Sequence, residues 1–254
     1  MTRSPRHAAL AFALALAFAG CAQAPQRNPL AAWVPSPNHD ARRPQLMVLH
    51  ATEQDSAGQS LHTLRTGHRG GPVSAHYLVA ADGALYQLVA DGDRAWHAGV
   101  GRWGAITDVN SASIGIELDN DGSAPFTEPQ FATLLRLLED LATRHRIPRT
   151  AVIAHADMAP TRKVDPGTRF PWRRLAEAGF GAWPADESPP PPAGFDPLRA
   201  LQAIGYDTRD PAAAIRAYRI RYRGIDGGEL DPEDLRRLRA LADGELLPPV
   251  PRSR

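Results

Sequence analysis

The stretch AVIAHADMAPTRKVDPG, residues 151–167, joins a short apolar run to a loop broken by proline and glycine. The apolar run is typical of a buried strand, and it ends on His155. Further along the loop, Asp165 precedes a proline, which biases its backbone toward an extended conformation. Imidazole nitrogen and carboxylate oxygen are both zinc ligands, and a catalytic zinc takes three protein ligands and keeps one position open for water. The stretch therefore offers two ligands, and a third must come from elsewhere in the chain.

His50 is the best candidate for the third ligand because it also ends an apolar run, Leu46–His50, that predicts a buried strand. In open α/β sheets, functional sites collect beyond the carboxyl ends of strands, so His50 and His155 can meet there. Taken singly, a histidine is more often a hydrogen-bonded structural residue than a ligand. Two further histidines, His76 and His97, stay open as candidates. The remaining five of the nine have simpler explanations in the N-terminal segments or in predicted helices: His7, His39, His62, His68 and His145.

Two charged residues could complete a hydrolytic site. Glu117 interrupts the alternating apolar pattern of the predicted strand Ser113–Leu118 and falls on the face opposite its isoleucines and leucine. Metal-assisted hydrolysis needs a base that takes a proton from water, and a carboxylate suits that role. Lys163 lies close to Asp165 and could stabilise negative charge developing on a carbonyl oxygen. The alternatives are an exposed strand residue for Glu117 and an ordinary solvated lysine for Lys163.

The surrounding pattern predicts an α/β fold. His76–Ala80 and Leu85–Val89 flank Asp82-Gly83, which indicates a β-hairpin. Thr127 and Gln130 form a capping-box pattern at the start of a predicted helix, whose apolar residues then follow at helical spacing: Phe131, Leu134, Leu135, Leu138 and Leu141. Strands that alternate with helices predict a mixed central β-sheet flanked by helices.

The C-terminal part of the chain predicts a separate helical unit. Residues 184–194 are rich in proline and read as a semi-rigid linker. Residues 195–245 contain three Asp-Pro pairs, each typical of an N-cap followed by proline in the first helical turn: Asp196-Pro197, Asp210-Pro211 and Asp231-Pro232. We expect a small three-helix bundle without a catalytic cluster of its own.

The N-terminus predicts export. Arg3 and Arg6 precede the apolar run Ala8–Ala19, which is too short to span a bilayer and suits a signal peptide over residues 1–20. The single cysteine, Cys21, follows in a context similar to the lipobox of bacterial lipoproteins, where the cysteine is acylated; the alternative is an ordinary signal peptide with an incidental cysteine. Residues 21–44 read as a polar tether. Loss of the two arginines lowers the formal net charge from +1 to −1, which argues against nucleic acid as a partner.

Five pieces of the sequence together resemble the zinc-dependent N-acetylmuramoyl-L-alanine amidases of the amidase-2 type, a family related to T7 lysozyme and the peptidoglycan recognition proteins. The resemblance implies the mixed-sheet fold of that family over residues 45–183. The pieces keep the family's order and spacing, so the match is far more specific than any one of them: Val48–His50, Ser74–Val79, Ala95–Gly99, Ser113–Glu117 and His155–Asp165.

The resemblance implies a role for each matching residue. It makes Glu117 the catalytic base and Lys163 the group that stabilises the transition state. It places three residues in or near the substrate cleft, with the last of them not a ligand: Trp96, His97 and His76. It implies one Zn²⁺ ion with three ligands: His50, His155 and Asp165.

The function that the resemblance implies is hydrolysis of the amide between N-acetylmuramic acid and L-alanine, in peptidoglycan or its anhydro-muropeptide fragments, during cell-wall turnover. Residues 195–245 resemble a peptidoglycan-binding bundle. With acylation of Cys21, we expect a monomer anchored by lipid to the periplasmic face of the outer membrane. Two rival hypotheses stay open, namely a non-catalytic wall-binding lipoprotein and a zinc enzyme that cleaves a peptide bond within the stem.

Overall fold

The computed structural model describes residues 27–41 and 44–249. The predicted signal peptide and Cys21 lie outside this range. Among the described residues, no helix combines the length and apolar character needed to cross a membrane. Part of the predicted tether is folded, because β1 (Ala32–Trp33) and β2 (His39–Ala41) both pair with other strands. The unpaired backbone N–H and C=O groups at a sheet edge can hydrogen-bond to such polar segments. Local composition alone does not reveal this pairing.

A six-stranded mixed sheet forms the centre of the fold, in the order β1-β5-β4-β7-β3-β8. The strand β3 is parallel to both of its neighbours, β7 and β8, and β4 is parallel to β7, whereas β4 and β5 form the predicted antiparallel hairpin. A separate two-stranded sheet joins β2 to β6 (Asp93–Ala95). The remaining strands are β3 (Leu46–Ala51), β4 (Tyr77–Val79), β5 (Leu85–Gln87), β7 (Ser113–Leu118) and β8 (Val152–Ala154).

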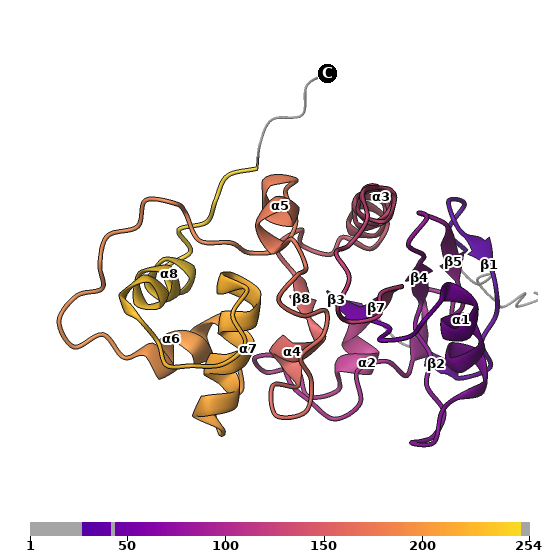
Figure 1. The fold of residues 1–254 in the computed structure, drawn as a ribbon, viewed down its shortest axis with the longest axis horizontal. Helices are drawn as coiled ribbons and strands as arrows, with labels where there is room; N and C mark the ends of the chain where they lie inside the picture. Colours follow the sequence, from indigo (N-terminus) through magenta and orange to yellow (C-terminus); the bar gives the residue numbers. More distant parts are fainter. Residues whose placement is uncertain (1–26, 42–43, 250–254) are drawn as a thin grey trace, which may run out of the picture.

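Helices cover both faces of this sheet, as predicted (Figure 1). On one face, α3 (Glu128–His145) and α5 (Trp172–Glu177) pack over an apolar core that includes Met47, Leu49 and Ile116. On the other face, the short helices α2 (Val109–Ala112) and α4 (His155–Met158) lie over a smaller cluster. The helix α1 (Ala57–Thr66) lies near the β1 end of the sheet (Figure 1).

Three C-terminal helices begin where the Asp-Pro pairs predicted. In α6 (Pro197–Ile204), α7 (Pro211–Arg223) and α8 (Pro232–Ala242), the N-cap aspartate accepts a hydrogen bond from a backbone N–H of the first turn. These helices lie beyond β8 at one end of the molecule, with α7 against α4 and α5 (Figure 1). Buried side chains of α7 and α8 belong to the same apolar core as those of β3 and α3, so the two parts of the chain share one core.

Two local predictions differ from the structure. Thr127 does cap α3 by accepting from the backbone N–H of Gln130 at 3.2 Å, but the Gln130 side chain does not complete a capping box. Its amide donates instead to the carbonyls of Val79 and Asp119 at 2.9 and 3.0 Å, which ties the helix to the ends of two strands. His155 does not end β8 but begins α4, because the chain turns into a short helix directly after Ala154.

Candidate metal centre and active site

The strands β3, β7 and β8 all present one face to the site. Because side chains alternate along a strand, Val48 and His50 share a face, as do Gly115 and Glu117 on the neighbouring strand. His50 and Glu117 are direct partners in the parallel register. His155 follows β8, the neighbour of β3 on its other side. Parallel pairing therefore brings three segments that are distant in the sequence to the same end of the sheet, as the strand pattern predicts.

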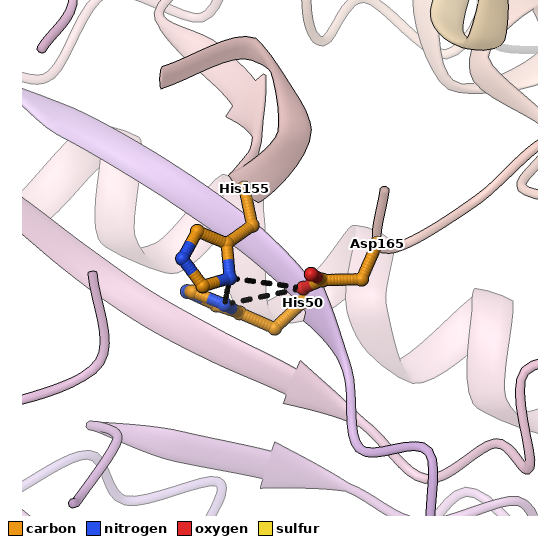
Figure 2. A group of neighbouring side chains, drawn as sticks. All are labelled: His50, His155 and Asp165. Carbon is orange, nitrogen blue, oxygen red and sulfur yellow. Dashed lines mark hydrogen bonds and ion pairs between the residues drawn. The ribbon is translucent and has the colours of Figure 1, made fainter. Parts of the chain in front are cut away.

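His50, His155 and Asp165 converge on one point (Figure 2). The two Nδ1 atoms are 2.9 Å apart, and Asp165 Oδ2 lies 3.1 Å from His155 Nδ1 and 3.5 Å from His50 Nδ1. Ligand atoms at zinc distances of about 2.0–2.1 Å in a tetrahedral arrangement are roughly 3.3 Å apart. All three side chains are buried. Their donor atoms and spacing fit a zinc ion.

When the two imidazoles are neutral, hydrogen bonds on their far sides place the proton on Nε2 and leave Nδ1 free to bind a metal. The carbonyl of Ala98 can only accept, so His155 Nε2, at 3.1 Å from it, carries the hydrogen. Ser113 donates its hydroxyl hydrogen to the Val109 carbonyl, and its oxygen is then free to accept from His97 Nε2 at 3.3 Å. His97 Nδ1 therefore accepts from His50 Nε2 at 3.0 Å. Such fixed tautomers are what metal-binding histidines require.

Electrostatics keep His50 neutral and Asp165 ionised. Burial, together with the neighbouring His155, lowers the pKa of His50 to about 4, so this imidazole is neutral at neutral pH. Burial alone would raise the pKa of Asp165, but its contacts with His155 and His50 outweigh burial and hold the pKa well below its usual range. A neutral His50 and an ionised Asp165 suit a divalent cation, whose ligands must be deprotonated.

Glu117 faces this cluster with one oxygen unsatisfied. Its Oε2 is buried and has no hydrogen-bond partner within the described chain. Burial, with the nearby charge of Asp165, raises the pKa of Glu117 to about 8 in the metal-free protein, although Lys163 opposes the shift. A cation beside the carboxylate would lower that pKa and favour the ionised form, which can accept a proton from water.

One cavity contains nearly all of the predicted site. The three candidate ligands, Glu117 and Lys163 line it, as do Trp96 and His97. Its further wall comes from α1 and the segment after it, with Thr63, Leu64 and His68, and from Glu53 and Gln54 beyond β3. Lys163 is the only lysine in the sequence. The one lysine ammonium group therefore lines this cavity, whereas the arginines supply the other strongly basic side chains.

His76 departs from its expected place in the substrate cleft. Its side chain is fully buried and does not line the cavity. Its Nδ1 accepts from the backbone N–H of Gly115 at 3.0 Å, while Nε2 lies 3.0 Å from the Asp93 carbonyl. His76 therefore connects β7 to β6 behind His97, and it cannot touch a substrate in this arrangement. A histidine at this position of the motif can lie in the cavity wall or in the layer behind it, and the sequence alone does not distinguish the two.

Three residues near the metal ligands carry no functional assignment from sequence reasoning. Arg162 donates to the carbonyls of Ala98 and Val100, and so holds the loop whose Ala98 carbonyl orients His155. Ser113 fixes the tautomer of His97. Asp157 is buried beside His155. Nothing in the sequence near them predicts these roles, because each depends on a partner brought close only by folding.

Comparison with known proteins identifies the family. Residues 40–168 match the model of the Amidase_2 family, described as N-acetylmuramoyl-L-alanine amidase, and the chain belongs to this family. The predicted fold and the predicted amidase class are thereby confirmed. The family, together with the His-His-Asp cluster, is consistent with a zinc amidase.

Individual relatives extend the match through most of the chain. AmiD of Escherichia coli K12 is 37% identical over 224 residues, covering 75% of this chain and 79% of the relative. A solved structure of E. coli AmiD in complex with the substrate anhydro-N-acetylmuramic acid-L-Ala-D-γ-Glu-L-Lys superposes with a TM-score of 0.70 at 35% identity, covering 86% of this chain and 93% of that one. AmpDh3 of Pseudomonas aeruginosa gives a TM-score of 0.70 at 31% identity, covering 86% and 98%.

Proposed function

We propose that this protein is a zinc-dependent hydrolase of the amide between N-acetylmuramic acid and L-alanine, acting on peptidoglycan or its anhydro-muropeptide fragments. The observation that carries the proposal is the convergence of two imidazole Nδ1 atoms and one carboxylate beside the unsatisfied Glu117. The substrate class comes from the relatives, since E. coli AmiD has been captured with an anhydromuramoyl tripeptide.

The reaction replaces a C–N bond by a C–O bond. A zinc ion held by His50, His155 and Asp165 would polarise the amide carbonyl and lower the pKa of water to about 7. The Glu117 carboxylate takes one proton from the attacking water and passes it to the nitrogen of the leaving L-alanine. The Lys163 ammonium, in the same cavity, stabilises the negative charge that develops on the carbonyl oxygen. Trp96 and His97 remain our candidates for contacts with substrate.

The test measures newly freed L-alanine amino termini after incubation of purified peptidoglycan with the zinc-loaded protein. Removing the base should lower the rate by about 10²- to 10⁴-fold in Glu117→Gln, while its zinc content stays equal to that of the wild type. Glu128→Gln is the matched control, because Glu128 is an exposed carboxylate paired with Arg174 on the surface. Its rate should be unchanged.

The same assay separates the rival functions. A non-catalytic wall-binding protein would retain peptidoglycan without releasing amino termini, even with zinc bound. Cleavage within the stem peptide would give fragments that retain muramic acid linked to L-alanine, and mass spectrometry distinguishes these from the expected products. Either result would show the proposed bond to be wrong. Parallel assays with intact wall and with anhydro-muropeptides would define the preferred form.

We also propose that acylated Cys21 anchors a monomer to the periplasmic face of the outer membrane, and that residues 195–245 help to hold the wall near the site. A tethered binding unit would raise the local concentration of substrate. The lipobox-like context of Cys21 supports the anchor, and the likeness to an N-acetylmuramoyl-L-alanine amidase supports a place beside the cell wall. Expression of Cys21→Ser should move the protein from the membrane fraction to the soluble fraction. Equal membrane association of both forms would contradict the anchor.

A further inference from the structure

Asp157 has a buried carboxylate that receives three hydrogen bonds. It lies on α4 just after His155, and its side chain is fully buried. Oδ2 accepts from the backbone N–H of Ala154 at 2.8 Å and from the guanidinium of Arg221. Oδ1 accepts from the hydroxyl of Tyr206 at 2.6 Å. A buried carboxylate needs such partners, because without them its charge would be costly to keep out of water.

Two of these three donors come from the C-terminal helices. Tyr206 follows directly after α6, and Arg221 lies on α7. The Arg221 guanidinium also donates to the carbonyl of Val152 at 3.0 Å and lies 4.2 Å from the ring centroid of Trp172. A single side chain of α7 therefore binds the strand before Ala154 and the helix after it. The turn between β8 and α4 is held from outside the amidase sheet.

That turn carries the candidate ligand His155 and is hydrogen-bonded to the backbone of a second one, Asp165. His155 lies between Ala154, whose N–H donates to Asp157, and Ala156, whose N–H donates to the carbonyl of Asp165 at 3.0 Å. The backbone positions of both ligands thus depend on how α4 begins. The position of the Asp157 carboxylate depends in turn on Arg221 and Tyr206. A shift of this group would move His155 relative to His50, which sits on a different strand.

We propose that Asp157 is a positioning residue for the metal site, and that the C-terminal helices set the affinity for zinc through Arg221 and Tyr206. The inference rests on the proposed zinc centre and adds a second role for the helical unit. Besides any contact with the wall, this unit completes the support of His155. If the network served packing alone, its loss would lower overall stability without a specific effect on the metal.

The experiment compares two conservative changes in the full-length protein. Tyr206→Phe removes the hydroxyl that donates to Asp157. Tyr218→Phe is the matched control, because Tyr218 is equally buried and its hydroxyl donates to the Asp234 carbonyl, within the helical unit. Zinc affinity is measured by competition with a chromophoric chelator, and the ligand field is measured by the visible spectrum of the cobalt-substituted protein.

We expect Tyr206→Phe to bind zinc more weakly and to shift the cobalt spectrum, while Tyr218→Phe matches the wild type in both. Asp157→Asn should weaken zinc binding further, by about tenfold, at the lower end of the cost of losing an outer partner of a metal ligand. If Asp157→Asn does not fold, the comparison of Tyr206→Phe with Tyr218→Phe tests the proposal by itself. Equal zinc affinity in Tyr206→Phe and the wild type, or an equal loss in both tyrosine variants, would overturn the proposal.

These outcomes are distinct from a failure of the proposed function. A wild-type protein that binds no zinc, or that binds zinc but frees no L-alanine amino termini, contradicts the function itself. A wild-type protein that does both, with an unchanged affinity in Tyr206→Phe, contradicts only the role of Asp157 and leaves the amidase proposal intact.

Discussion

Glu117 combines two properties that ordinary strand residues lack. Its carboxylate is enclosed beside the metal ligands, and one oxygen has no partner within the described chain. Burial raises its pKa to about 8 without metal, so the residue is largely protonated at neutral pH until a cation arrives. In the proposed mechanism, metal binding and activation of the base are therefore coupled at this single side chain.

The raised pKa predicts a pH-dependent stability difference between the wild type and Glu117→Gln after zinc is removed by chelation. The unfolded chain ionises near pH 4.5, whereas the fold keeps Glu117 protonated up to about pH 8. The wild type therefore loses stability as pH rises from 4.5 to 8, and the neutral glutamine does not. We expect glutamine to gain about 4 kcal/mol relative to the wild type at pH 8, since the pKa rises from 4.5 to about 8 and each pKa unit is worth about 1.4 kcal/mol.

Urea unfolding of both metal-free proteins at several pH values measures this difference. The gain should vanish near pH 4, where both side chains are neutral, apart from a constant offset from the substitution itself. A difference that does not change with pH would show that Glu117 ionises normally in the folded protein.

At the scale of elements, β7 is shaped to receive His97. Gly115 lies between two isoleucines of the strand, and a Cβ added there would lie 2.3 Å from Cγ of His97. The absence of a side chain lets the His97 ring reach His50 Nε2 at 3.0 Å. The small size of Gly115 therefore serves the geometry of the site, because a larger residue would stabilise the strand itself more.

Gly115→Ala should displace His97 and weaken zinc binding, together with a loss of about 1–3 kcal/mol from overpacking. Gly58→Ala in α1 is the control, because its Cβ would meet only Ser56 Oγ at 3.9 Å, and alanine favours the helix by about 0.5–1 kcal/mol. Denaturant unfolding and zinc competition on both variants provide the measurement. Normal zinc affinity in Gly115→Ala would show that His97 does not support His50.

At the scale of the whole molecule, the two parts of the chain share one apolar core and a buried ion pair. The Asp157 and Arg221 side chains are almost completely buried, and they join α4 of the amidase part to α7 of the helical unit. The linker prediction treats residues 195–245 as a separate unit, and the chain does pass through a proline-rich segment before it. The packing nevertheless places α7 against α5 and against α4, the helix that begins with the candidate ligand His155.

Arg221→Met should destabilise the protein by about 3–5 kcal/mol, because it leaves the Asp157 charge buried without its cationic partner. Arg216→Met, on the same helix, removes an arginine from an exposed pair with Asp226 and should cost less than about 1 kcal/mol. Urea denaturation of the two variants compares these costs directly. Similar values for both would mean that water reaches the Asp157–Arg221 pair.

The sequence by itself determined the features that depend on short stretches of chain. The apolar runs that lead up to His50 and His155 predicted buried strands, and the Asp-Pro pairs predicted the starts of all three C-terminal helices. The isolated charge of Glu117 in an apolar strand predicted its side chain in the site. These features follow from side-chain periodicity and from local capping. Both act over a few residues and can therefore be predicted without knowledge of the fold.

Only the tertiary structure decided which distant groups meet. Asp157 and Arg221 are separated by 64 positions, and His50 and His97 by 47, yet each pair is in hydrogen-bond contact. Packing also decided the position of His76. Its place in the motif predicted a residue of the cleft, whereas the fold buries it behind the cavity wall. Contacts of this kind depend on strand order and on the docking of helices, which local propensity does not encode. The candidate metal ligands could be predicted from the sequence, whereas the residues that hold them in place required the folded chain.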